Sequence, residues 1–218
     1  NIKTLLICEK NNVNFFGMIF YPNSPRNISY QIARKLQIKS EKLKINGVGV
    51  FVNKEITEIL NYIEDLKLKF VQLHGEEDYK YIDKLKKLNV KVIKKISIGS
   101  KNDLKKIENY KNSDYFLFDY KPKINELPGG NAKSFDWNII KNIQINKPWF
   151  LSGGINIKNI QMIKSEKKDE SEKIALEEQE IIEKKEATTK KESVEEESLE
   201  DKLKIAQEKL LRSMAETE

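Results

Sequence analysis

The sequence predicts an α/β fold built around a parallel sheet. Short runs rich in β-branched and aromatic residues alternate with lysine-rich helical segments through residues 15–156, which is the pattern of successive βα units. One of these runs, residues 115–118, is apolar throughout, as expected for a strand that is covered on both faces of the sheet. Polar residues or glycines follow the runs, so the loops able to carry chemistry should meet at one end of the sheet.

The alternation gives the expected elements in order. Six strands are expected, at residues 15–21, 47–52, 70–73, 90–98, 115–118 and 148–151. The helices are expected at residues 2–10, 29–38, 54–66, 77–88, 102–110 and 136–143, with a further one starting near Asn156. Ser134 is suited to cap the helix over residues 136–143, because a serine side chain accepts a hydrogen bond from the first free backbone N–H groups.

The segment from Tyr115 to Trp137 is the most informative in the chain. Its apolar strand ends at Asp119, and residues 121–130 contain two prolines and the pair Gly129-Gly130. Prolines and paired glycines interrupt regular structure, so this segment is interpreted as a lid or substrate loop. An acid at the tip of a buried strand beside such a loop is typical of an enzyme site. The alternative is that Asp119 only caps a turn.

Six motifs, taken together, resemble those of phosphoribosylanthranilate isomerases in order and spacing. They cover about three quarters of the chain and lie at residues 20–26, 49–53, 71–75, 118–119, 129–137 and 151–154. The resemblance implies an incomplete (β/α)8 TIM barrel with about six strands. It also implies an intramolecular Amadori rearrangement of a phosphorylated small-molecule substrate in tryptophan biosynthesis, with no organic cofactor and no metal.

The resemblance assigns roles to the matched residues. Asp119 takes the position of the general acid, which must keep its proton to open the furanose ring. Arg26 matches the residue that binds the anthranilate carboxylate. Gly153 and Gly154 allow backbone N–H groups to approach the substrate phosphate. His74, the single histidine, is expected to bind or position the substrate rather than to transfer a proton.

Two parts of the family pattern are not found. The family's general base is a cysteine on a first strand with a Lys-Ile-Cys-Gly type motif, and its second phosphate loop follows a last strand. Cys8 is not that base, because it lies in a predicted helix, where a free cysteine is commonly a small buried hydrophobe. We therefore expect the chain as given to be inactive, marginally stable and prone to self-association through the open edges of the sheet or through a C-terminal helix.

The last quarter of the chain has a different composition. Residues 165–218 contain 18 acidic and 11 basic residues and no glycine, proline or aromatic residue. Three domains are therefore expected: the partial barrel over residues 1–164, a charged disordered linker over 165–197 and an amphipathic helix over 198–218. That helix resembles the start of the dimerisation helix of a GrpE-type nucleotide-exchange factor for DnaK chaperones, although chaperone binding by so short a piece is not expected. A generic charged helix is the alternative.

Composition also narrows the function classes. The net charge is +6, but the lysines are distributed among glutamates along the predicted helices, which argues against nucleic acid. A single cysteine and the lack of a signal peptide or membrane span favour the cytoplasm. Three hypotheses remain: an isomerase-family domain, a dimerising co-chaperone fragment, or a non-functional hybrid of two genes.

Overall fold

The structure is a computed structural model that describes residues 1–141 and 143–160. The chain divides into two compact units, Asn1–Ile155 and Asn156–Glu218. The first unit contains every strand of the described residues. Of the second unit, residues 156–160 are described: a turn in which the backbone N–H of Ile160 donates to the Asn156 carbonyl at 3.0 Å. The predicted linker over 165–197 and the exchange-factor-like helix over 198–218 lie outside the described residues.

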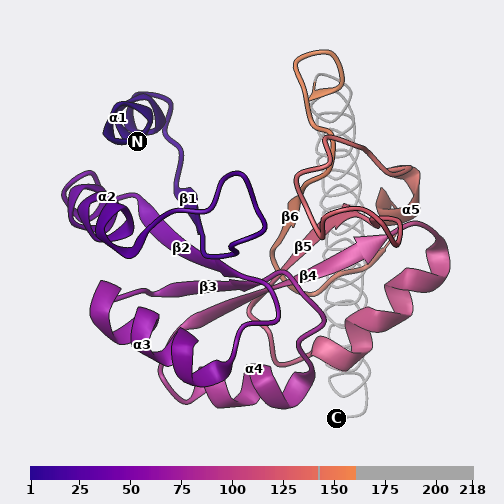
Figure 1. The fold of residues 1–218 in the computed structure, drawn as a ribbon. Helices are drawn as coiled ribbons and strands as arrows, with labels where there is room; N and C mark the ends of the chain where they lie inside the picture. Colours follow the sequence, from indigo (N-terminus) through magenta and orange to yellow (C-terminus); the bar gives the residue numbers. More distant parts are fainter. Residues whose placement is uncertain (142, 161–218) are drawn as a thin grey trace, which may run out of the picture. The chain divides into compact units, whose positions relative to one another are not determined.

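Six parallel strands form one sheet in sequential order (Figure 1). They are β1 (Phe15–Ile19), β2 (Asn46–Phe51), β3 (Phe70–Leu73), β4 (Lys91–Ile98), β5 (Tyr115–Tyr120) and β6 (Trp149–Leu151). A parallel sheet in which each strand pairs with the next one along the chain is wound like a barrel and not like a doubly wound sheet. The predicted α/β half-barrel is thereby confirmed, and β1 and β6 are its edges.

The helices alternate with the strands as predicted, beginning with α1 before β1. They are α1 (Ile2–Lys10), α2 (Tyr30–Lys42), α3 (Ile56–Leu66), α4 (Tyr79–Lys86), the 3-10 helix η1 (Lys101–Tyr110) and the short α5 (Asn138–Lys141). Ser29 caps α2 and Asp78 caps α4 through side-chain oxygens that accept a backbone N–H. The prediction that Ser134 caps α5 is wrong, because the carboxylate of Asp136 accepts the N–H of Asn138 at 3.1 Å instead.

Alternate residues of each strand face different cores. The helix-facing side of the sheet packs against α1 to α4 around Met18, Phe51, Val71 and Val92. Farther along, Phe118 and its neighbours on β4 and β5 form a second cluster with η1 and α5. The opposite face of the sheet forms the interior of the half-barrel, with Val48, Val50 and Ile93 at its centre. The sheet therefore has two apolar faces, which is why its strands read as nearly continuous apolar runs.

The half-barrel is strongly curved even though its edges are not hydrogen-bonded to each other. Phe15 on β1 and Phe150 on β6 meet across the interior with ring centroids 5.5 Å apart. Phe70 and Tyr115 complete this aromatic layer, with centroids 5.1 Å from Phe15 and 5.7 Å from Phe150 respectively. Aromatic packing, rather than a closed ladder, thus holds the two edges together at the N-terminal end of the strands. Self-association through these edges stays a prediction.

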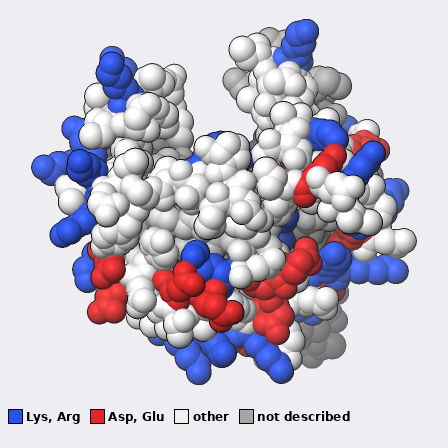
Figure 2. Space-filling model, viewed as in Figure 1, with Lys and Arg blue, Asp and Glu red and all other residues white. Residues whose placement is uncertain are grey.

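Charged side chains are spread over the surface. On the face shown in Figure 2, lysines and arginines lie around the rim with acidic groups between them, and the centre of the view is largely uncharged. The prediction that nucleic acid is not a partner stays a prediction. In the described part of the chain, no helix combines the length and apolarity that crossing a membrane requires.

Cys8 is half-buried on α1 rather than fully buried as a core residue. Leu5 is the buried residue of this helix, and Ile7 is 61% exposed. The expectation that Cys8 is not part of the site agrees with its place on a helix, outside the strand ends.

Candidate active site

The C-terminal ends of β3, β5 and β6 bring three predicted site segments together. Backbone hydrogen bonds extend the sheet just beyond the strands: the N–H of His74 donates to the Phe51 carbonyl at 2.8 Å, and that of Ser152 donates to the Phe118 carbonyl at 2.8 Å. Because parallel strands present their carboxyl ends at one edge, residues far apart in sequence meet here. The structure thus places Asp119, His74 and the Gly153-Gly154 pair beside one another.

Asp119 is a buried carboxylic acid near the end of β5, and it is 6% exposed. Its Oδ1 accepts the backbone N–H of Tyr120 at 2.9 Å. Burial raises the pKa of Asp119 above its usual value, while Lys95 and Arg26 act in the opposite direction. The net effect makes Asp119 a weaker acid than an exposed aspartate, which is the direction of change that a general acid requires.

His74 lies against Asp119 with its Nε2 atom 3.5 Å from the carboxylate Oδ2. On its other side, Nδ1 is 2.8 Å from the amide nitrogen of Gln72. With that amide nitrogen donating, Nδ1 accepts and the ring proton is on Nε2. Burial, assisted by the charges of Lys95, Lys94 and Arg26, lowers the pKa of His74 to about 3. The imidazole is therefore neutral at pH 7 and suited to positioning.

The state of His74 can be tested directly because it is the chain's single histidine. We expect its imidazole resonance to titrate near pH 3 in the folded protein. Since the pKa is lower in the folded than in the unfolded chain, this group's contribution to stability is complete above about pH 6.5 and is lost as the pH falls towards 3. Proton NMR measures the titration of the His74 ring, and urea unfolding at pH 7 and pH 4.5 measures the loss of stability.

A His74→Gln variant is the control for this prediction. It removes the titrating ring, so its stability should fall less between pH 7 and pH 4.5 than that of the unchanged chain. A midpoint near 6.5 in the folded protein would show that the ring is exposed to solvent and would contradict the buried site.

Arg26 reaches the site from the loop that follows β1. That loop is folded back on the strand, since Ile28 donates its N–H to the Ile19 carbonyl at 3.0 Å and Asn27 forms a bridge with Ile19. A Cβ atom added to Gly130 would lie 2.4 Å from Nη2 of Arg26. The guanidinium therefore contacts the loop after β5, although Arg26 as a whole is exposed.

Gly153 and Gly154 both have positive φ angles, of +86° and +63°. A Cβ atom on Gly153 would come within 3.1 Å of Asp119 Oδ1, and one on Gly154 within 2.7 Å of the Ser134 nitrogen. Side chains are thus excluded at both positions by backbone conformation and by crowding. The pair closes the edge of the site beside the acid, and its predicted role in phosphate binding stays a prediction.

The loop between β5 and α5 lies over these residues. At its start, the ammonium of Lys121 forms an ion pair with the carboxylate of Asp103, with Nζ 2.7 Å from Oδ1. Near its end, Lys133 forms an ion pair with Glu126. Between them, Gly129 packs on the His74 ring so closely that a Cβ atom would be 2.4 Å from Nε2. The predicted lid or substrate loop therefore lies against the His74 ring and contacts the exposed Arg26.

Two buried lysines of β4 were missed by the sequence analysis. Lys95 is 5% exposed and donates to the Pro128 carbonyl of the loop at 2.8 Å. Lys94, on the opposite face of the strand, forms a 2.8 Å ion pair with Glu77. Successive side chains of a strand point to opposite faces of the sheet. Because the residues around these two adjacent lysines are apolar on both faces, the sequence could have shown that both cannot be solvated.

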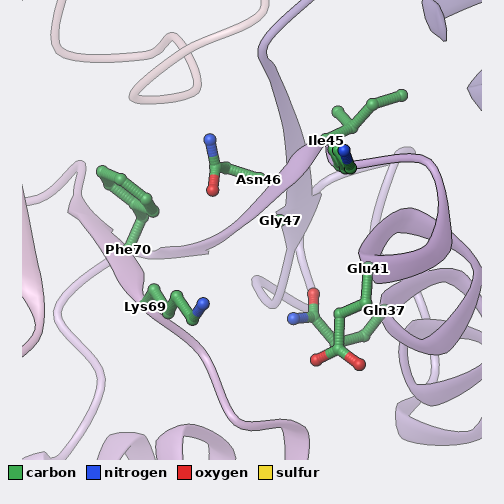
Figure 3. A pocket seen from close by; sticks show the side chains of 8 residues that line it. Gln37, Glu41, Ile45, Asn46, Gly47, Lys69 and Phe70 are labelled. Carbon is green, nitrogen blue, oxygen red and sulfur yellow. The ribbon is translucent and has the colours of Figure 1, made fainter.

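A pocket of about 480 Å³ lies at the other end of the strands (Figure 3). It is formed by the start of β2 and β3 and the end of α2, and Gln37, Glu41 and Lys69 line it. The buried Oε1 atom of Gln37 has no hydrogen-bond partner there. None of the predicted site residues lies in this pocket. Among residues 1–141 and 143–160, no cluster of histidine, cysteine or acidic residues is arranged to hold a metal ion.

The comparisons with known proteins agree with this geometry. The family model described as N-(5'phosphoribosyl)anthranilate (PRA) isomerase matches residues 1–176. The N-(5'-phosphoribosyl)anthranilate isomerase of Clostridium acetobutylicum is 40% identical over 157 residues, which are 71% of this chain and 73% of the relative.

Solved structures give the same result. A crystal structure of the phosphoribosyl anthranilate isomerase of Thermotoga maritima superposes with a TM-score of 0.65 at 31% identity, covering 74% of this chain and 77% of that one. A second isomerase structure is a complex with reduced 1-(o-carboxyphenylamino)-1-deoxyribulose 5-phosphate. It has a TM-score of 0.61 at 29% identity and covers 74% of this chain and 75% of that one. The chain therefore belongs to the phosphoribosylanthranilate isomerase family, the isomerases of tryptophan biosynthesis.

Proposed function

We propose that this site performs the Amadori rearrangement of N-(5'-phosphoribosyl)anthranilate, with Asp119 as the general acid. The observation that carries the proposal is the environment of Asp119: a buried carboxylic acid whose pKa is raised by burial, 3.5 Å from a neutral histidine. A raised pKa increases the fraction of such an acid that carries a proton at a given pH, and this is the proton that a general acid gives to the substrate.

In the proposed first step, Asp119 donates its proton to the furanose ring oxygen. The bond from C1 to that oxygen breaks, and the anthranilate nitrogen supplies the electron pair that forms a C1–N double bond. Loss of the proton from C2 then gives the enol form of the product, which becomes the ketone. We assign no described residue to removal of the C2 proton; in the family resemblance, that role belongs to the cysteine of the Lys-Ile-Cys-Gly strand.

The remaining residues are proposed to bind the substrate. The Arg26 guanidinium would pair with the anthranilate carboxylate, because two parallel N–H donors match a carboxylate. His74 would contact the substrate beside Asp119, with Gln72 holding the ring through its Nδ1 atom. Gly153 and Gly154 would leave their backbone exposed for close approach of the phosphate.

Binding of the product analogue tests this proposal without requiring turnover. We expect reduced 1-(o-carboxyphenylamino)-1-deoxyribulose 5-phosphate to bind the chain in a calorimetric titration. Arg26→Gln should weaken binding about 10-fold to 100-fold, the loss expected for a charged hydrogen bond. Arg34→Gln, which changes an exposed arginine on α2, should bind as the unchanged chain does.

Turnover is measured in parallel by the loss of phosphoribosylanthranilate fluorescence. The assay uses the chain as given and a version carrying the Lys-Ile-Cys-Gly strand at its N-terminus. The proposal would be overturned if the analogue did not bind and neither version of the chain turned over the substrate. The predicted inactivity of the chain as given is read from the same assay. The alternatives of a co-chaperone fragment or a hybrid of two genes rest on residues 165–218 and stay predictions.

A further inference from the structure

Lys95 is a charged residue inside the half-barrel that the proposed reaction does not use. Strand β4 alternates so that Ile93 belongs to the interior cluster, and Lys95, two residues on, shares that face. Ser97, the next residue on the same face, is paired in register with Asp119. Lys95 therefore lies between the apolar interior and the acid. An ammonium group in such a place is costly unless its charge and hydrogen atoms find partners.

Its hydrogen-bond partner comes from the loop after β5. Nζ of Lys95 donates to the carbonyl oxygen of Pro128 at 2.8 Å, across 33 positions in the sequence. The same carbonyl accepts a hydrogen bond from His74, which acts to raise the pKa of that ring. The Pro128 carbonyl thus accepts from two donors, Lys95 on β4 and His74 at the end of β3. Among the loop's other side-chain bonds, that of Lys121 to Asp103 ties its start to η1, whereas those of Lys133 to Glu126 and Asn131 to Leu127 join parts of the loop to each other.

The two residues that follow Pro128 contact the proposed substrate-binding groups. Gly129 packs on the imidazole of His74, and Gly130 packs on the guanidinium of Arg26. At both positions a Cβ atom would come within 2.4 Å of a ring or guanidinium nitrogen. The loop therefore has little freedom once its carbonyl is held. A shift of the Pro128 carbonyl would move both glycines off the residues that they cover.

We propose that Lys95 is a positioning residue that holds the loop over the active site by binding the Pro128 carbonyl from inside the barrel. The loop can then open only when this hydrogen bond breaks, which places the entry of substrate under the control of one lysine. The inference rests on the proposed function for the identity of the residues that the loop covers.

The charge of Lys95 has a second effect, on the acid and the imidazole. Asp119 on β5 faces Lys95 and Arg26, and both lower its pKa. His74 at the end of β3 faces Lys95, Lys94 and Arg26, which lower its pKa, and the carboxylate of Asp119. The pKa of Lys95 is itself affected by the charges of Asp119, Glu76, Glu77 and Lys94. Removing the Lys95 charge should therefore raise the pKa values of both His74 and Asp119.

The test compares Lys95→Met, which removes the donor and the charge, with Lys95→Arg, which keeps both. Lys91→Met is the matched control, because Lys91 is on the same strand but 56% exposed. Hydrogen exchange of the amides in residues 123–131 is followed by mass spectrometry, and the His74 resonance is followed by NMR. Neither readout needs substrate, so failure of both analogue binding and turnover would overturn the proposed function and leave this test unaffected.

We expect Lys95→Met to speed exchange in residues 123–131 at least 10-fold, with no change in the amides of β2 and β3. The His74 midpoint should rise by about half a pH unit or more. Lys95→Arg and Lys91→Met should retain the original values. Unchanged exchange in the loop, or equal acceleration in the loop and in the sheet, would overturn the proposal. If Lys95→Met does not fold, Lys95→Gln is measured against the same criteria.

Discussion

Asp119→Asn should lower the turnover of phosphoribosylanthranilate by about 100-fold to 10,000-fold, the usual contribution of a general acid. The amide has nearly the same shape as the acid and can still accept the N–H of Tyr120, which now donates to Asp119 Oδ1 at 2.9 Å. It has no acidic proton to give to the ring oxygen. The loss should therefore appear in kcat, measured in whichever version of the chain shows turnover, while KM changes little.

The pH profile gives an independent check on the same residue. In the proposed mechanism the protonated form of Asp119 is the active one, so turnover should decrease as the pH rises through its raised pKa. Asp136→Asn changes an exposed carboxylate in the segment after the loop and should keep turnover within about 3-fold. Equal turnover by Asp119→Asn and the unchanged chain would remove Asp119 from the mechanism.

Lys94→Met should lower the free energy of unfolding by about 3–5 kcal/mol, the cost of leaving a buried charge without its partner. Lys94 and Glu77 are 1% and 2% exposed, and their charged atoms are 2.8 Å apart. The ammonium also donates to the Gly75 carbonyl at 2.7 Å. Glu77 in turn accepts backbone N–H groups of Asn53 at 2.8 Å and of Gly75 at 3.0 Å. The pair thus ties the loops after β2 and β3 to β4.

Urea unfolding measures this loss. The double variant Lys94→Met/Glu77→Gln should be less destabilised than Lys94→Met, because the amide needs no counter-charge and can still accept from the backbone. Lys91→Met on the same strand should cost at most about 1 kcal/mol, as exposed ion pairs contribute little. A loss below 1 kcal/mol in Lys94→Met would mean that water reaches the pair.

Local sequence patterns predicted most of the fold. All six strands were expected, and their observed ends differ by at most two residues from the predicted ones. Strand 70–73 and helix 2–10 agree at both ends. The position of each strand is indicated locally, by an apolar run of a few residues and by the glycines, prolines and polar residues on either side of it. The helix ends differ more: α2 ends at Lys42, four residues beyond its predicted end, and α4 and α5 are each four residues shorter than predicted.

The sequence by itself determined which residues meet at the end of the sheet, since His74 and Asp119 come at the ends of two apolar runs, β3 and β5, of one parallel sheet whose carboxyl ends share one edge. Only the tertiary structure decided what surrounds them. The contact of Lys95 with Pro128 joins residues 33 positions apart, and the packing of Gly129 on His74 depends on how the loop folds back. A strand's period assigns a side chain to a face, whereas its partner and its protonation depend on distances that only the folded chain fixes.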